Sequence, residues 1–316
     1  MSELPRIVVA GEALIDLTAD GDPGRYRAHP GGGPANAAVA LARLGADVGF
    51  VGRLSTDRFG ATLVRWFADN GVDLSLSVRA DQPTTLAVAS PDDHGVMSYT
   101  FYSEGTANWQ WSLDELPAEL PGVQALHLGS LASRVEPGAS AIEALRRRCA
   151  PKMTVFADPN FRAQFDDAAV ARAQLSRWVA ECDIVKLSVD DVAFTHPGGD
   201  PVALARSWST RANALIVLTD GPRGAHAFVD GDVISAATRP ARVVDTIGAG
   251  DAFGAAFLFT LQALGGLSKG SVRPPGMLER ALRVACGCAT ITCERSGADT
   301  PRITDLPGDV VALLRP

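Results

Sequence analysis

The sequence is poor in lysine, which occurs only at Lys152, Lys186 and Lys269, so that arginine supplies nearly all of the positive charge. Acidic side chains outnumber basic ones by 36 to 29, which gives a formal net charge of −7. The arginines are scattered except for a run at residues 146–148, which we predict to lie on the polar face of a surface helix. Binding to a nucleic-acid backbone needs clustered positive charge, so we expect no nucleic-acid partner.

The sequence also lacks an apolar run long enough to span a bilayer. The longest nearly apolar stretch, residues 252–267, is interrupted by Thr260 and Gln262 and falls short of the roughly 20 residues required. The first six residues lack the basic and then apolar layout of a secretory signal. We therefore expect a cytoplasmic protein without a membrane partner.

Cysteine and histidine are scarce, with five of each among 316 residues. An odd number of cysteines in a chain without an export signal argues against a disulfide framework. Cys286, Cys288 and Cys293 lie close together, but no histidine is near them, and we predict packed apolar side chains rather than metal ligands. The histidines show no metal-binding or catalytic spacing. His127, between two leucines, is predicted to be a core residue to which we assign no role.

Short β-branched runs alternate with helical segments rich in alanine and leucine along most of the chain. Several runs are apolar at successive positions, which is typical of a parallel sheet covered on both faces. The alternation predicts one α/β domain over residues 1–316 with a mainly parallel central sheet. The expected strands are residues 6–10, 48–52, 124–128, 153–157, 183–187, 215–219 and 225–229. The expected helices are residues 35–44, 61–70, 139–149, 168–180, 202–210, 251–264 and 277–293.

Two stretches, residues 14–30 and 78–102, interrupt this alternation with extended segments and polar turns. The second has the form of a hairpin, with strands at 85–90 and 96–102 around the turn at 91–95. The first contains a turn of the same kind at residues 20–24. We expect these stretches to form a small separate sheet that acts as a lid on the α/β core.

The strongest chemical signal is Gly248-Ala249-Gly250-Asp251, a glycine-rich turn that follows a β-branched pair and precedes an apolar helix. At such a helix start, free N–H groups and the positive end of the helix dipole favour an anion. Asp251 is either a simple N-terminal carboxylate of the helix or a base that accepts the proton of an attacking hydroxyl. In the second interpretation, the Gly248, Ala249 and Gly250 amides stabilise charge on a transferred phosphoryl group.

A second glycine-rich turn, Gly31-Gly32-Gly33-Pro34, leads into an alanine-rich helix whose first turn contains Asn36. Asn36 either satisfies local backbone groups or, with Gly32 and Gly33, binds sugar hydroxyls. Two other phosphate-binding motifs fail on spacing. No lysine follows a glycine as a P-loop requires, and Gly248, Gly250 and Gly254 are spaced one residue too widely for a dinucleotide fingerprint.

The sequence resembles the ribokinase-like (PfkB) family of sugar kinases nearly from end to end. Residues 32–60 follow the N-terminal signature of that family and residues 245–251 follow its C-terminal signature, in the same order and about 210 residues apart. The resemblance implies a three-layer α/β/α core with a β-sheet lid formed by about 12–34 and 76–106. It also implies ATP as the phosphoryl donor and Asp251 as the catalytic base.

The resemblance implies further site residues. Arg162, after the strand-end sequence Asp158-Pro159-Asn160, either reaches the substrate or forms a surface salt bridge, and Phe101 packs either on a sugar face or in the lid. The residues expected to bind the sugar are Asp16, Gly32, Gly33, Asn36, Phe101 and Arg162. Those expected to bind ATP are Ser188, Asp191, Thr219, Gly221 and Gly224, and Asp245 and Ile247 are expected to frame a monovalent cation site.

Several positions depart from the family pattern. Ser188 and Asp191 stand where many members have Asn-x-x-Glu, which organises Mg²⁺ and phosphate. Gly33 replaces the lysine of ribokinases, which disfavours ribose, and Ser103 replaces an arginine frequent in ketodeoxygluconate kinases.

The resemblance therefore predicts an ATP-dependent sugar kinase of the fructokinase type, with ATP, Mg²⁺ and K⁺ as cofactors and a homodimer through the lid. The alternatives are a 2-keto-3-deoxygluconate, nucleoside or other sugar kinase. A sugar-binding regulator that has lost turnover is the alternative outside the enzymes.

Overall fold

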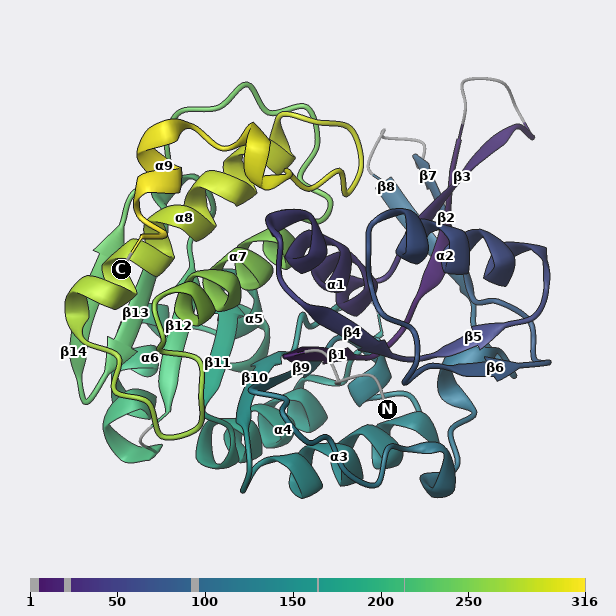
Figure 1. Cartoon of the computed structure of the whole chain (residues 1–316), viewed down its shortest axis with the longest axis horizontal. Helices are drawn as coiled ribbons and strands as arrows, with labels where there is room; N and C mark the ends of the chain where they lie inside the picture. The colour runs from purple at the N-terminus through teal and green to yellow at the C-terminus, as the bar shows by residue number, and fades with distance from the viewer. Residues whose placement is uncertain (1–5, 20–23, 92–96, 164, 213, 316) are drawn as a thin grey trace.

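The computed structural model describes residues 6–19, 24–91, 97–163, 165–212 and 214–315, and it shows a three-layer α/β/α core with a lid sheet at one end (Figure 1). The turns expected at 20–24 and 91–95 fall largely outside the described residues. None of the helices in the described ranges has the length and hydropathy of a membrane span.

The central sheet has eight strands in the order β14-β13-β12-β11-β10-β9-β1-β4. The six strands from β4 to β12 are parallel, and β13 and β14 add an antiparallel edge. The predicted mainly parallel sheet is confirmed. Along the chain the strands are β1 Ile7–Ala10, β4 Val48–Val51, β9 Ala125–Gly129, β10 Thr154–Asp158, β11 Ile184–Ser188, β12 Leu215–Thr219, β13 Ala225–Val229 and β14 Asp232–Ala236.

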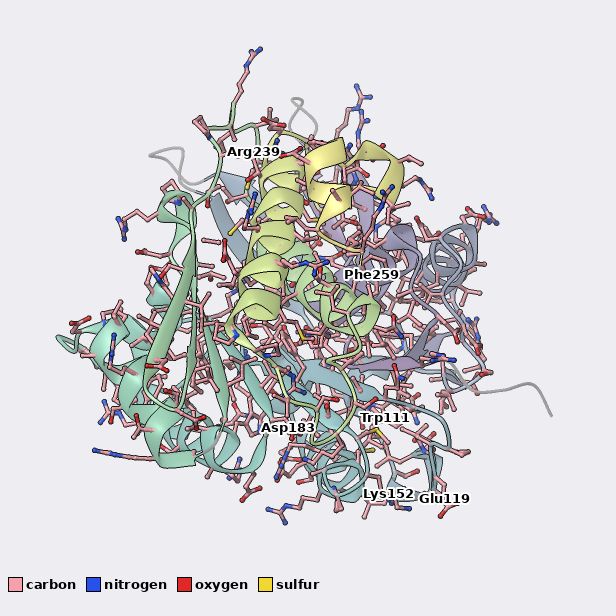
Figure 2. The ribbon with its side chains drawn as sticks, turned by 60° about the vertical axis from the view of Figure 1, so that its left-hand side comes forward. Trp111, Glu119, Lys152, Asp183, Arg239 and Phe259 are labelled. Carbon is pink, nitrogen blue, oxygen red and sulfur yellow. The ribbon has the colours of Figure 1, made fainter. Side chains whose placement is uncertain are left out.

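Helices cover both faces of this sheet, and nearly every residue of the six parallel strands is buried. One buried cluster lies between the sheet and the first helix group, and a second lies between the sheet and the other group. The first group is seen in part in Figure 2, where its long yellow-green helix runs beside the strands of the sheet. It contains α1 Gly33–Leu44, α7 Ala249–Ala263, α8 Pro275–Cys293 and α9 Gly308–Ala312. The second group contains α3 Gly138–Cys149, α4 Ala168–Glu181, α5 Val189–Thr195 and α6 Pro201–Ala212.

The lid is a four-stranded sheet in the order β3-β2-β7-β8, built from β2 Leu14–Ala19, β3 Tyr26–Gly31, β7 Leu86–Pro91 and β8 Met97–Tyr102. The hairpin expected near residues 85–102 is confirmed, since β7 pairs antiparallel with β8. The helix α2 Arg58–Asp69 and the pair β5 Arg53–Ser55 and β6 Val78–Ala80 lie beside it (Figure 1). The remaining elements are 3-10 turns: η1 Ala107–Trp109, η2 Leu113–Glu115, η3 Leu131–Ser133, η4 Gly221–Arg223 and η5 Ile303–Asp305.

The prediction that the arginine run at residues 146–148 lies on an exposed helix face is wrong at its first residue. Arg146 is only 1% exposed and pairs with Glu143 and Glu181, whereas Arg147 is exposed. Successive residues of an α-helix are about 100° apart, so a run of three on α3 spans too wide an arc to share one polar face.

Candidate active site

Two helices, α1 and α7, begin side by side at the carboxyl end of the central strands, and their first turns carry the two polar residues singled out from the sequence. Asn36 lies in the first turn of α1, and Asp251 lies in the first turn of α7, which begins at Ala249 rather than at Asp251 as predicted. The Asn36 Nδ2 donates to the Asp251 Oδ2 at 2.9 Å. Two motifs 215 residues apart therefore meet in one hydrogen bond.

Glycine is required at the residue before each of these helices. The backbone angle φ is 102° at Gly32 and 76° at Gly248, values that L side chains rarely adopt. A Cβ at Gly32 would lie 2.7 Å from the carbonyl oxygen of Glu12, and a Cβ at Gly248 would lie 2.6 Å from the Cβ of Ala298. The bare backbone thus allows both helix starts to approach their neighbours closely.

The surroundings of Asp251 move the pKa of its carboxyl toward neutrality. Burial raises the pKa of its carboxyl from 3.8 to about 7, and the negative charge of Asp158 acts in the same direction. The hydrogen bond from Asn36 and the positive charges of Lys186 and Arg162 lower the pKa and limit the rise. A carboxyl with a pKa near the working pH is suited to accept a proton and release it again.

A pocket opens at these two helix starts, and its lining comes from both halves of the chain. Two of its residues, Ser130 and Asn160, are non-glycine residues with positive φ, 55° and 47°. Such conformations cost about 1–3 kcal/mol each and cluster at functional sites. The lining residues are Gly33, Pro34, His127, Gly129, Ser130, Asp158, Asn160 and Asp251.

Glu12 holds one wall of this pocket in place. Its carboxyl is 1% exposed, and its Oε2 accepts from the Ala132 backbone N–H at 2.9 Å. The Ser130 side chain also hydrogen-bonds to it, although burial still raises the pKa of Glu12 above its usual value. The strained backbone at Ser130 is therefore fixed by a buried acid that the sequence motifs did not single out.

Lys186 is the one buried lysine of the three. Lys152 pairs with Glu119 at 3.6 Å and Lys269 pairs with Asp183 at 2.7 Å, both at the surface, where Figure 2 labels Lys152, Glu119 and Asp183. Lys186 is 5% exposed, and its Nζ donates to the Asp158 Oδ2 at 2.7 Å beneath the pocket.

The Lys186 ammonium lies directly under the glycine-rich turn. A Cβ added at Gly250 would lie only 3.2 Å from its Nζ. Burial alone would lower the pKa of Lys186, but the charges of Asp158, Asp191 and Asp251 keep it above the usual value. A fixed positive charge therefore supports the start of α7, where an anion is favoured.

Asp16 lies on β2 in the lid, opposite His29 on β3. Its carboxylate reaches the turn before α1, because a Cβ at Gly31 would fall 2.0 Å from the Asp16 Oδ2. Burial raises the pKa of Asp16 to about 6. Asp16 is thus placed beside Gly31, directly before the Gly32-Gly33 turn, and its contact with sugar hydroxyls stays a prediction.

The substitution Gly31→Ala tests this placement. The new methyl group would displace the Asp16 carboxylate, and we expect the KM for the sugar to rise about 10- to 100-fold, the usual effect of losing a hydrogen bond to a charged group. The KM for ATP should change less than about 2-fold. Gly276→Ala is the matched control, since a Cβ there meets nothing within 4 Å. Equal increases in both KM values would contradict the assignment.

The two remaining sugar-side residues lie where lid and core meet. The Phe101 ring, on β8, packs edge-to-face on Phe165 with 4.7 Å between centroids. Phe165 follows β10, so this contact joins the lid sheet to the core. Arg162 is exposed, and its charge lowers the pKa of Asp251. Contact of either side chain with a sugar stays a prediction.

The residues expected on the ATP side come from neighbouring strands. Ser188 ends β11 and Thr219 ends β12, where the two are register partners. Ser188 and Asp191 form a capping box at the start of α5, and the other Asp191 oxygen accepts from the Phe161 N–H at 2.8 Å. Both carboxylate oxygens of Asp191 are therefore engaged by the protein itself, and its contact with ATP stays a prediction.

Gly221 and Gly224 bracket the 3-10 turn η4, with φ of 51° and 105°. A Cβ at Gly224 would lie 2.1 Å from the Ala236 carbonyl oxygen, so this turn packs against the end of β14. The turn begins two residues after Thr219, so that Thr219, Gly221 and Gly224, three of the five predicted ATP-binding residues, lie at the end of β12.

The Asp245 carboxylate joins the segment at Ile247, which is expected to frame a monovalent cation site, to the segment at Gly297. Its Oδ1 accepts from the Ile247 N–H at 3.0 Å, and its Oδ2 accepts from the Gly297 N–H at 2.9 Å. Ile247 itself is 38% exposed. The two segments are adjacent, and binding of a cation between them stays a prediction.

Sequence reasoning missed several residues of this site. It assigned no role to His127, and it did not select Ser130, Asp158, Asn160 or Lys186. A usable signal was present for Lys186 and Asp158, since a charged residue inside an otherwise apolar parallel strand has to be paired when it is buried. The positive φ values at Ser130 and Asn160 have no counterpart in the sequence.

Comparison with known proteins agrees with this geometry. Residues 4–305 match the model of the pfkB family carbohydrate kinases. A fructokinase of Klebsiella pneumoniae is 36% identical over 95% of this chain and 98% of its own. A fructokinase of Rhizobium leguminosarum bv. trifolii is 34% identical, over 88% of this chain and 85% of its own.

Solved structures superpose over nearly the whole chain. The fructokinase of Xylella fastidiosa with bound ATP has a TM-score of 0.86 at 27% identity, covering 98% of each chain. A fructokinase of Vibrio cholerae O395 with fructose, ADP and potassium ion has a TM-score of 0.81 at 26% identity, covering 100% of each chain. With two signatures joined by one hydrogen bond and a matching fold throughout, the chain belongs to the pfkB family of carbohydrate kinases, the ATP-dependent sugar kinases of the ribokinase-like fold.

Proposed function

We propose that this sugar kinase transfers the terminal phosphoryl group of ATP to fructose. The observation that carries the proposal is the Asp251 carboxyl, half-buried at the start of α7, with a pKa raised to about 7 and held by Asn36. The relatives named above as fructokinases support fructose as the acceptor. Gly33 and Ser103, which stand where ribose and ketodeoxygluconate kinases carry cations, support it from the sequence.

In the proposed reaction the acceptor hydroxyl lies within reach of Asp251, which takes its proton. The hydroxyl oxygen forms a bond to the γ-phosphorus as the bond to ADP breaks. The first-turn N–H groups of α7, at Gly248, Ala249 and Gly250, then stabilise the negative charge on the transferred group, and Lys186 beneath them adds a positive charge. Asp16 and the Gly32-Gly33 backbone hold other hydroxyls of the sugar.

The nucleotide binds, in this proposal, along Ser188, Thr219, Gly221 and Gly224. Among the described residues no three acidic, histidine or cysteine side chains are grouped to hold a metal ion. In this proposal a Mg²⁺ ion would be held chiefly by the phosphates of ATP, and not by a dedicated set of protein ligands. When bound there, the ion would neutralise charge on the phosphates.

Closure of the lid sheet over the core would exclude water and limit hydrolysis of ATP. The contact between Phe101 and Phe165 already joins the two parts. The homodimer through the lid, which the family resemblance implies, stays a prediction.

The acceptor is tested by steady-state phosphorylation of fructose, 2-keto-3-deoxygluconate, ribose and adenosine, with ADP release as the readout. We expect fructose to give the highest kcat/KM. A higher value for another acceptor would overturn the choice of fructose, and no turnover with any acceptor would favour a sugar-binding regulator.

A further inference from the structure

His127 is a polar residue in the wall of the active-site pocket, although the sequence suggests an ordinary core position. It lies on β9, with Val9 and Phe156 as register partners on the neighbouring strands. Its side chain is 4% exposed, and its ring packs edge-to-face on Phe156 at 4.9 Å. It nevertheless lines the pocket together with Asp158 and Asp251.

Neither ring nitrogen of His127 has a hydrogen-bond partner among the described residues. An unpaired polar atom in a buried position costs about 1–3 kcal/mol, so such atoms in a native site call for a ligand or a bound water. Burial lowers the pKa of His127 to about 3, and the charge of Lys186 acts in the same direction. The imidazole is therefore neutral at any working pH and offers one donor and one acceptor.

Asp158 presents a second unpaired atom to the same pocket. Its Oδ2 is bound by Lys186 at 2.7 Å, while its Oδ1 has no partner within the described part of the chain. The ion pair fixes the carboxylate on the pocket floor, with one oxygen free to accept. A neutral donor and an ionised acceptor thus line one pocket.

We propose that His127 and Asp158 form a subsite for a second hydroxyl of the acceptor, distinct from the one that Asp251 deprotonates; this rests on the proposed function. A hydroxyl group can donate to the Asp158 Oδ1 while it accepts from the N–H of His127, which satisfies both groups. An anionic substituent of the acceptor would be repelled by the negative charges of Asp158 and Asp251. The neutral imidazole of His127 would offer it no compensating positive charge. The subsite selects neutral polyhydroxy acceptors over sugar acids.

Deoxy analogues of the acceptor test this subsite. The kcat/KM for fructose, 1-deoxyfructose, 3-deoxyfructose and 4-deoxyfructose is measured for the wild type, His127→Leu and His127→Gln. In the wild type, we expect the analogue that lacks the bound hydroxyl to lose about 10- to 100-fold relative to fructose. In His127→Leu this ratio should fall below about 3-fold, and in His127→Gln, which keeps a donor and an acceptor, it should stay near the wild-type value.

A wild-type measurement covers the case in which His127→Leu fails to fold. The ring nitrogens of ¹⁵N-labelled histidine are followed by NMR, with His127→Gln used to assign His127. Saturation with fructose should shift the His127 nitrogens at pH 7 while the ring stays neutral. The addition of 2-keto-3-deoxygluconate at the same concentration should leave the chemical shifts of the His127 nitrogens unchanged.

The outcomes separate this subsite from the proposed function. The wild type could phosphorylate fructose while His127→Leu keeps the wild-type ratio of kcat/KM between fructose and every deoxy analogue. In that case the ring nitrogens of His127 bind only water, and the proposed subsite is wrong. Unchanged His127 resonances on fructose saturation lead to the same conclusion. If the wild type phosphorylates none of the ketoses tested, the choice of fructose itself is wrong.

Discussion

Asp251→Asn is expected to lower kcat by about 10²- to 10⁴-fold, the usual contribution of a positioned general base. The amide has the size of the carboxylate and its oxygen can still accept from the Asn36 Nδ2, so the pocket keeps its shape. The dissociation constants for ATP and sugar should therefore change little, which calorimetric titration would establish. Asp309→Asn makes the same chemical change in the first turn of α9, at an exposed position, and should leave kcat unaltered.

The same variant should be more stable than the wild type at pH 8. The pKa of Asp251 is raised from 3.8 to about 7, which corresponds to about 4 kcal/mol at the full shift. The pKa of Asp251 is higher in the folded protein than in the unfolded chain. The free-energy cost of holding its charged form in the folded protein is therefore absent below both pKa values and complete above pH 7. We expect urea unfolding to show a gain of up to about 4 kcal/mol. Loss of stability together with loss of kcat would show a structural role for Asp251 instead.

Lys186→Met and Asp158→Asn are expected to move the acid limb of the pH–kcat/KM profile in opposite directions. The limb reports ionisation of Asp251 in the free enzyme, so activity rises with pH through about 7. Lys186 lowers the pKa of Asp251, and its removal should shift the limb to higher pH. Asp158 raises that pKa, and its neutralisation should shift the limb to lower pH. Shifts in the same direction would contradict this account.

Lys186→Met should also destabilise the fold by about 3–5 kcal/mol, because it leaves the Asp158 carboxylate buried without its partner. Lys269→Met is the matched control. It breaks a pair with Asp183 at the same 2.7 Å distance but at the surface, where such pairs contribute about 0–1 kcal/mol. The control should leave the acid limb in place. If both variants lost a similar free energy of unfolding, burial would not make the Lys186–Asp158 pair more stabilising than the surface pair.

Regular periodicity made most of the fold predictable. The strands expected at residues 215–219 and 225–229 have those bounds in the structure, and α3 begins within one residue of its prediction. The strand β14 was missed because its short sequence is mostly exposed and has no continuous apolar run. The helix α5, with seven residues, is too short to show a helical period, although its capping pair Ser188 and Asp191 was visible in the sequence.

The sequence by itself determined the α/β alternation, the lid hairpin, and the two glycine-rich turns with Asn36 and Asp251. Those features depend on local spacing, on glycine, and on helix starts, which neighbouring residues encode. Only the tertiary structure decided that Asn36 binds Asp251, that Lys186 underlies Gly250, and that His127 faces the pocket. Burial and pairing of these groups arise from segments distant in the chain. Burial is the largest cause of the raised pKa of Asp251, and it leaves the nitrogens of His127 without a hydrogen-bond partner among the described residues.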